Sequence, residues 1–192
     1  MRAEQHLSRR QFAQSSGVAL ALLFWQRLAH ATIVSGMTLE ALVQRSAHIV
    51  LVTPFASSAR FIDLPGSHRI VTDVNVRIDQ VLAKAPPAAS EVSVRVLGGV
   101  IGKSAEFVDG QAELSRGAPC LLFLCRVTDD VHWVAGMAQG HFPLRIDDAG
   151  TARLSASPRL PEMLHPERSA ARRLVGADIP AARALVERAL AP

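Results

Sequence analysis

The stretch LGGVIGKS, residues 97–104, comes closer to a phosphate-binding site than any other part of this sequence. It closes with Gly102, Lys103 and Ser104, which is how the P-loop pattern G-x-x-x-x-G-K-S ends. That pattern also requires glycine at its first position, where this chain has Leu97. A P-loop follows a strand that is apolar on both faces, whereas the preceding EVSVRV alternates. The sequence therefore favours a hairpin-like loop whose glycines permit positive φ angles over a nucleotide site.

Two histidines, His132 and His141, bracket the stretch VHWVAGMAQGHF. Histidines on adjacent strands can contribute to a metal site, with a carboxylate such as Asp129 or Asp130 as a further ligand. No H-x-H, H-E-x-x-H or C-x-x-C spacing accompanies them. The pattern favours half-exposed strand residues, with a metal site as the alternative.

The stretch GMAQGHF is the most suggestive of ligand binding. Gly136 and Gly140 bracket Gln139, and Trp133 lies just before them. Glycine within a β-rich region lets the backbone approach a partner closely. A bulge or a tight bend is the alternative, and the composition favours it.

Both cysteines, Cys120 and Cys125, fall in the apolar run PCLLFLC. In a strand their Cα atoms would be roughly 16 Å apart with side chains on opposite faces. Since a disulfide needs Cα atoms within about 7 Å, we expect two buried, inert thiols. Burial also raises a thiol pKa and suppresses its reactivity. The sequence contains no G-x-S-x-G motif and no convincing carboxylate pair, so we predict neither catalytic residues nor a cofactor.

The N-terminus resembles a twin-arginine (Tat) export signal, which bacteria use to export folded proteins. The residues that carry the resemblance are Ser8, Arg9, Arg10 and Phe12, followed by a short apolar run and by small residues at Ala29 and Ala31. The run is about half as long as the ~20 residues that span a bilayer, which excludes a stable anchor. Its apolar residues are contiguous, which disfavours the alternative of an amphipathic helix. The pattern predicts cleavage after Ala31 and a periplasmic or secreted protein, whose transient partner is the Tat translocon.

The basic charge of the chain comes mostly from this segment. The chain has 21 basic and 17 acidic residues. Four of the arginines and one glutamate precede residue 32, which leaves 17 basic and 16 acidic residues after cleavage. A nearly neutral chain with scattered arginines excludes a strong nucleic-acid interface.

Alternating and apolar runs predict a mainly β fold. Thr38 is expected to cap a short helix, and Asp178 a C-terminal helix in which Leu185, Val186 and Leu190 dock on the domain. Proline, glycine and serine predict a loop at 54–69, and prolines predict a loosely packed segment at 155–178. The predicted strands are 48–53, 70–82, 91–97, 120–127, 131–137 and 138–146, with a hairpin into 151–155, and a short strand is expected around Phe107.

These elements predict a small antiparallel β-barrel or sandwich of OB-like type. We divide the chain into a signal peptide at 1–31, a barrel domain at 32–154, and a segment at 155–192 whose helix packs on the domain. The order TLEALVQRSAHIVLVT, TDVNVRIDQVL, VSVRVLGG, GAPCLLFL, VAGMAQGHF resembles a group of bacterial exported proteins with OB-fold-like (TIMP- or netrin-like) β-barrels. TIMP-type inhibitors place an N-terminal cysteine on a protease metal. The expected mature start, TIVSGM, has no cysteine, so the resemblance does not imply that mechanism.

Together these patterns predict an exported module that binds a protein, a peptide or an envelope component. The alternative is a periplasmic metal-binding protein or enzyme whose site is assembled from scattered histidines and carboxylates. A structural envelope protein is a third class.

Overall fold

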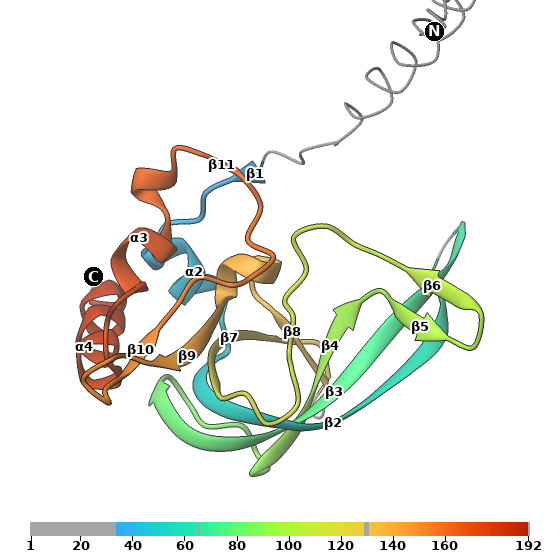
Figure 1. Ribbon diagram of the computed structural model, residues 1–192, viewed down its shortest axis with the longest axis horizontal. Coiled ribbons are helices and arrows are strands. Elements are labelled where there is room, and N and C mark those ends of the chain that lie inside the picture. Colours follow the sequence, from blue (N-terminus) through green and yellow to red (C-terminus); the bar gives the residue numbers. More distant parts are fainter. Residues whose placement is uncertain (1–33, 65, 129–130, 192) are drawn as a thin grey trace, which may run out of the picture. The chain divides into compact units, whose positions relative to one another are not determined.

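The computed structural model describes residues 34–64, 66–128 and 131–191 (Figure 1). The predicted export signal, its cleavage site and the two aspartates considered as metal ligands lie outside the described residues. Within them, no helix is long and apolar enough to cross a membrane.

A long hairpin forms the centre of the sheet. Strand β2 (His48–Leu64) pairs antiparallel with β3 (Ser67–Ala83) along its whole length, so the loop predicted at 54–69 is wrong. The ladder tolerates Pro54, which lacks an N–H donor, because the register shifts between Pro54 and Ala56. The turn is confined to the chain around Gly66, whose φ of +79° suits glycine.

Five strands partly close into a ring, the small barrel predicted from the sequence. Its members after the hairpin are β4 (Glu91–Leu97), β7 (Cys120–Arg126) and β8 (Val131–Val134). Neighbours around the ring are β7, β2, β3, β4 and β8, and β8 pairs again with β7. The β4–β8 pair is parallel and the others are antiparallel, so the barrel is not wholly antiparallel as predicted.

Shorter elements extend this ring. Strands β9 (His141–Ile146) and β10 (Ala152–Leu154) continue the sheet beyond β7. Beyond β4, β5 (Gly99–Ile101) and β6 (Ser104–Glu106) form a hairpin, and the predicted strand around Phe107 stops at Glu106. The remaining short elements are β1 (Val34–Ser35), which pairs with β11 (Met163–Leu164), and the 3₁₀ helices η2 (Met137–Gly140) and η3 (Pro166–Arg168).

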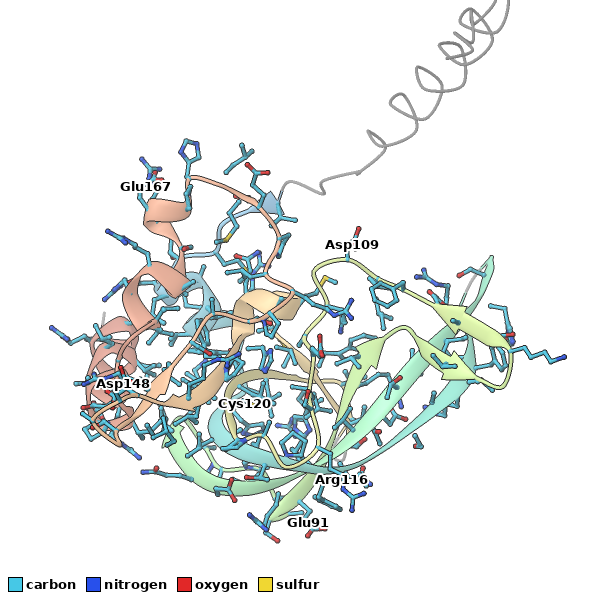
Figure 2. The ribbon with its side chains drawn as sticks, in the orientation of Figure 1. Glu91, Asp109, Arg116, Cys120, Asp148 and Glu167 are labelled. Carbon is cyan, nitrogen blue, oxygen red and sulfur yellow. The ribbon has the colours of Figure 1, made fainter. Side chains whose placement is uncertain are left out.

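Strand β7 explains why a run can be apolar on both faces. Leu121 and Phe123 pack against the helices, whereas Leu122 and Leu124 lie in the core inside the ring. Cys120, labelled in Figure 2, belongs to the inner core, and Cys125 packs against the helix-side core. Both cysteines are free; Cys120 is buried as predicted, whereas Cys125 is only half-buried, so the prediction of two buried thiols is wrong for Cys125.

Three helices cover the outer core. In α2 (Leu39–Arg45), Thr38 Oγ1 accepts a hydrogen bond from Ala41 N at 3.2 Å, as predicted for an N-cap. Residues predicted to be loosely packed form α3 (Ala170–Leu174). That prediction is wrong because Leu174, fully buried, completes the helix-side core.

The C-terminal helix α4 (Ile179–Leu190) begins at the predicted cap, where Asp178 Oδ1 accepts from Ala181 N at 2.9 Å. Val186 is fully buried as expected, but Leu190 is 41% exposed and does not dock. Arg183 links α4 to β3, because its guanidinium donates hydrogen bonds to the carbonyl oxygens of Val81 and Leu82, both at 2.9 Å. Figure 1 shows the three helices on one side of the molecule, away from the β5–β6 hairpin.

Candidate ligand pocket at one end of the barrel

A pocket of about 340 Å³ opens where β3 and β4 run beyond the ring. The β5–β6 hairpin and the segment 107–114 form its other walls, with Arg159 reaching in from the later chain. Figure 1 shows this hairpin beside the far half of β2 and β3. Most lining side chains are apolar, including Val74, Val96, Leu97, Val108, Ala112 and Leu114. The volume of the pocket and its mostly apolar lining suit a small ligand or a single side chain.

Two glycines turn the chain from β4 into the hairpin. Gly98 and Gly99 have φ angles of +89° and +145°, which L side chains rarely adopt. A Cβ on Gly98 would lie 2.7 Å from the carbonyl oxygen of Glu106, and one on Gly99 would lie 2.4 Å from Thr72 Oγ1. These positions need glycine because β6 lies close to Gly98 and β3 lies close to Gly99.

The former P-loop candidate is therefore a hairpin. Gly102, with a φ of +58°, and Lys103 form the exposed turn between β5 and β6, and Ser104 begins β6. The favoured loop with positive φ angles is confirmed. A P-loop leads into a helix, whereas this chain leads into a strand.

Glu106 ties the hairpin to β3. Its carboxylate accepts a hydrogen bond from Ile70 N at 2.6 Å and another from Arg69 Nε. The Ile70 amide, and then the Arg69 guanidinium, hold the pKa of Glu106 below its usual value. The charged form of this side chain therefore stabilises one wall of the pocket.

Replacing Glu106 by glutamine is expected to speed hydrogen exchange in the hairpin at pH 7. Because the pKa of Glu106 is lower in the folded chain, its contribution is complete above about pH 5. That contribution disappears as the pH falls through the folded-state pKa. The difference in exchange rate between wild type and Glu106→Gln should shrink as the pH is lowered from 7 to 3. Asp109→Asn, which changes an exposed side chain of the next segment, should leave the exchange rates of the hairpin unchanged. A constant difference down to pH 3 would contradict this assignment.

The entrance of the pocket is built by three side chains. The Phe107 ring is 73% exposed, and the Arg159 guanidinium lies 4.2 Å from its centroid. Arg159 Nε also donates to Glu113 at 2.8 Å. The cation–π contact and the ion pair hold the rim together across 46 residues of chain.

Gln111 is a buried polar residue of the pocket lining. Its side chain is 6% exposed, and Oε1 has no hydrogen-bond partner among the residues that the structure describes. A buried acceptor without a partner costs about 1–3 kcal/mol.

The residues predicted to bind a ligand near η2 hold the N-terminal segment instead of lining the pocket. Gln139 Oε1 accepts from Met37 N at 2.7 Å, and Nε2 donates to the carbonyl oxygen of Ser35 at 3.2 Å. Gly136 has a φ of +65°, and Gly140 lies so close to Ala135 that a Cβ would be 2.2 Å from its carbonyl oxygen. Trp133 lies half-buried on β8. The tight bends of the backbone at these two positions therefore explain why both are glycine.

Both histidines considered as metal ligands are buried, so the half-exposed placement is wrong. His132 alternates with Val134 and therefore points into the ring, where its centroid lies 5.2 Å from that of His48. His141 Nδ1 lies 2.9 Å from Ser157 Oγ, and burial lowers the pKa of His141 to about 4. Across 34–64, 66–128 and 131–191, no three His, Cys, Asp or Glu side chains cluster to hold a metal ion.

The thiols are poorly suited to nucleophilic chemistry. Burial raises the pKa of Cys120 to about 12 and also raises that of Cys125. Cys125 Sγ donates to the carbonyl oxygen of Arg45 at 3.3 Å. The thiolate is the reactive form, so neither side chain is activated at neutral pH.

The sequence interpretation did not single out the polar pocket residues. Gln111 and Glu113 fall in a stretch predicted as a connection, in which only a short strand around Phe107 was expected, and Arg159 falls in one predicted to be loosely packed. The apolar positions Val108, Ala112 and Leu114 were the available sign that this connection packs on the barrel.

No protein-family model matches the chain, and no curated protein is significantly similar to it.

Proposed function

We propose that this protein is an exported binding module and that its ligand, a protein, a peptide or an envelope component, enters the pocket at the end of the barrel. The observation that carries this proposal is a pocket of about 340 Å³ whose lining is mostly apolar and includes a few polar side chains. Binding sites combine apolar walls with a few polar groups that orient the ligand. The raised pKa of both thiols favours binding over nucleophilic catalysis.

Blocking the pocket tests this function. Ala105 lines the pocket from an exposed position on β6, so Ala105→Phe fills it without replacing a core residue. We expect the variant to lose the component that the immobilised wild-type protein retains from an envelope extract. Ser104→Phe is the matched control, because Ser104 is exposed beside Ala105 but does not line the pocket. Equal retention by both variants would place binding elsewhere.

Export is the second part of the proposal, and it is supported by the N-terminal sequence. Replacing Arg9 and Arg10 by lysine is expected to hold the precursor in the cytoplasm, because the arginine pair is the feature that a Tat signal presents. Fractionation followed by N-terminal sequencing measures this, and the wild-type product should begin at Thr32. The matched control is Arg27→Lys, which changes a basic residue outside the pair. Undiminished export of the double variant would refute the Tat assignment.

A further inference from the structure

Building on the proposed pocket function, we infer that the ligand is an extended peptide segment that adds a strand to the outer edge of β2 over residues 57–63. One apolar side chain of the segment enters the pocket. Main-chain hydrogen bonds to a free sheet edge give affinity in this mode of recognition, and the pocket for a side chain gives specificity.

The far half of β2 is paired on one side only. Strand β7 pairs with the other side as far as Val52, and Gly117 N then donates to the carbonyl oxygen of Pro54 at 2.8 Å. Beyond Pro54, among the residues that the structure describes, β3 is the only strand that pairs with β2. Residues 57–63 are therefore an edge strand, in the part of the hairpin that runs beyond the ring.

The direction of the main-chain groups at this edge follows from β3. Ile70 directs its own groups away from β2, because its N–H donates to Glu106 at 2.6 Å and its carbonyl oxygen accepts from Gly98 N at 2.8 Å. In an antiparallel pair, two directly opposite residues either exchange both hydrogen bonds or exchange neither. Phe61 lies opposite Ile70, so its N–H and C=O face the outer edge, as do those of every second residue back to Ser57. An extended peptide offers donors and acceptors at the same repeat.

The edge lacks the features that usually prevent strand addition. The stretch FASSARFID, residues 55–63, contains neither lysine nor proline. Its two charged side chains are both engaged with β3. Arg60 Nε donates to Asp73 at 3.0 Å, and Asp63 Oδ1 lies 2.6 Å from His68 Nδ1. Neither charge is committed to guarding the outer edge.

The pocket lies on the matching face of this edge. Ser57 is an exposed residue of the edge and also lines the pocket, together with its partner Val74 on β3. In paired strands, directly opposite residues place their side chains on the same face of the sheet. The peptide residue that pairs with Ser57 therefore has its side chain on the face where the pocket is.

The lining determines which side chain enters. Its walls are mostly apolar and enclose about 340 Å³. The three charged side chains of the lining are each paired within the protein, Glu106 with Arg69 and Glu113 with Arg159. A charged side chain would have to break one of these pairs or enter unpaired, and either is costly. An aliphatic or aromatic side chain fits instead.

Amide hydrogen exchange of the full chain tests the pairing. The probe is a capped heptapeptide of alternating threonine and valine with leucine at its centre, because these β-branched residues favour strands. At a peptide concentration ten times its Kd, we expect exchange at Ser57, Ala59 and Phe61 to slow about tenfold. Exchange at Ser58 and Arg60 should not change, since these alternate residues direct their N–H groups to β3.

Two comparisons locate the contacts. Replacing the central leucine of the probe by alanine should weaken binding about tenfold or more, because less apolar surface enters the pocket. Phe61→Pro removes an N–H that faces outward, so the β2–β3 ladder keeps its hydrogen bonds. We expect this variant to bind the leucine peptide less tightly than the matched Phe61→Val, which loses the same ring but keeps the N–H.

The outcomes separate this inference from the function on which it rests. No binding of the leucine peptide, or binding that leaves the three outward amides unprotected, would overturn strand addition. Equal affinities of the leucine and alanine peptides would overturn the placement of the side chain in the pocket. Protection without peptide that rises with protein concentration would assign the edge to a second copy of the chain and would also overturn the inference. The proposed pocket function fails separately, if Ala105→Phe does not change retention from the envelope extract.

Discussion

Replacing Phe123 by alanine is expected to lower the free energy of unfolding by about 3–5 kcal/mol. Phe123 is fully buried between the sheet and the helices. Its ring packs edge-on against Phe142, with centroids 6.0 Å apart. The substitution removes the burial energy of the ring and leaves a cavity that rigid strands cannot fill. A domain of this size has about 5–15 kcal/mol of stability, so the loss is a large part of the total.

Urea unfolding of wild type and variant measures this difference through the transition midpoint. Phe107→Ala is the matched control, because it removes the same atoms from a side chain that is 73% exposed. Its expected cost is about 1 kcal/mol or less, which includes the cation–π contact with Arg159. Similar losses in the two variants would show that Phe123 is not part of the core that joins sheet and helices.

The strands that alternate strictly were predictable because burial on one face leaves a period of two in the sequence. In β4, Val92, Val94 and Val96 are buried as expected. The far half of the central hairpin was not predictable in this way. It lies beyond the ring, where Phe55 and Phe61 are partly exposed and the alternation is weak. Pairing with β3 makes this segment a strand, and that pairing is a tertiary contact rather than a local preference.

Closure of the ring was predictable only as a class. Short strands at regular spacing indicate a barrel or sandwich, but they do not specify that β4 and β8 run parallel, with Val94 opposite His132. The same closure explains the error for His132. A histidine is polar enough to suggest a half-exposed position. However, His132 lies two residues before the buried Val134, on the same face of β8. On this strand the alternation was a better guide to burial than the polarity of one residue.

The candidate pocket depends on contacts that no local pattern encodes. Arg159 reaches Glu113 across 46 residues, and Glu106 reaches Ile70 across 36. The sequence did predict the loop character of 97–104, because glycines at positive φ have a local cause. It did not predict that this loop would form a wall of the pocket, since that depends on the contact of Glu106, on β6, with Ile70 on β3.

The glycine at position 140 was predicted to approach a ligand or to form a tight bend, and its surroundings give it a structural role with a large expected effect. Gly140→Ala is expected to lower the free energy of unfolding by about 3 kcal/mol. Its Cβ would lie 2.2 Å from the carbonyl oxygen of Ala135, a backbone atom that moves only if the turn between β8 and β9 moves. That turn also carries Gln139, which binds Met37 N.

The variant should therefore also expose its N-terminal segment to proteolysis earlier than wild type, in parallel with its lower midpoint of denaturation. Gly36→Ala is the matched control, because its φ is not in the left-handed region and its Cβ would meet neighbours at an ordinary 3.4 Å. A wild-type midpoint for Gly140→Ala would mean that the turn can relax. The approach of Ala135 to position 140 would then reflect the absence of a side chain there and would not be a requirement of the fold.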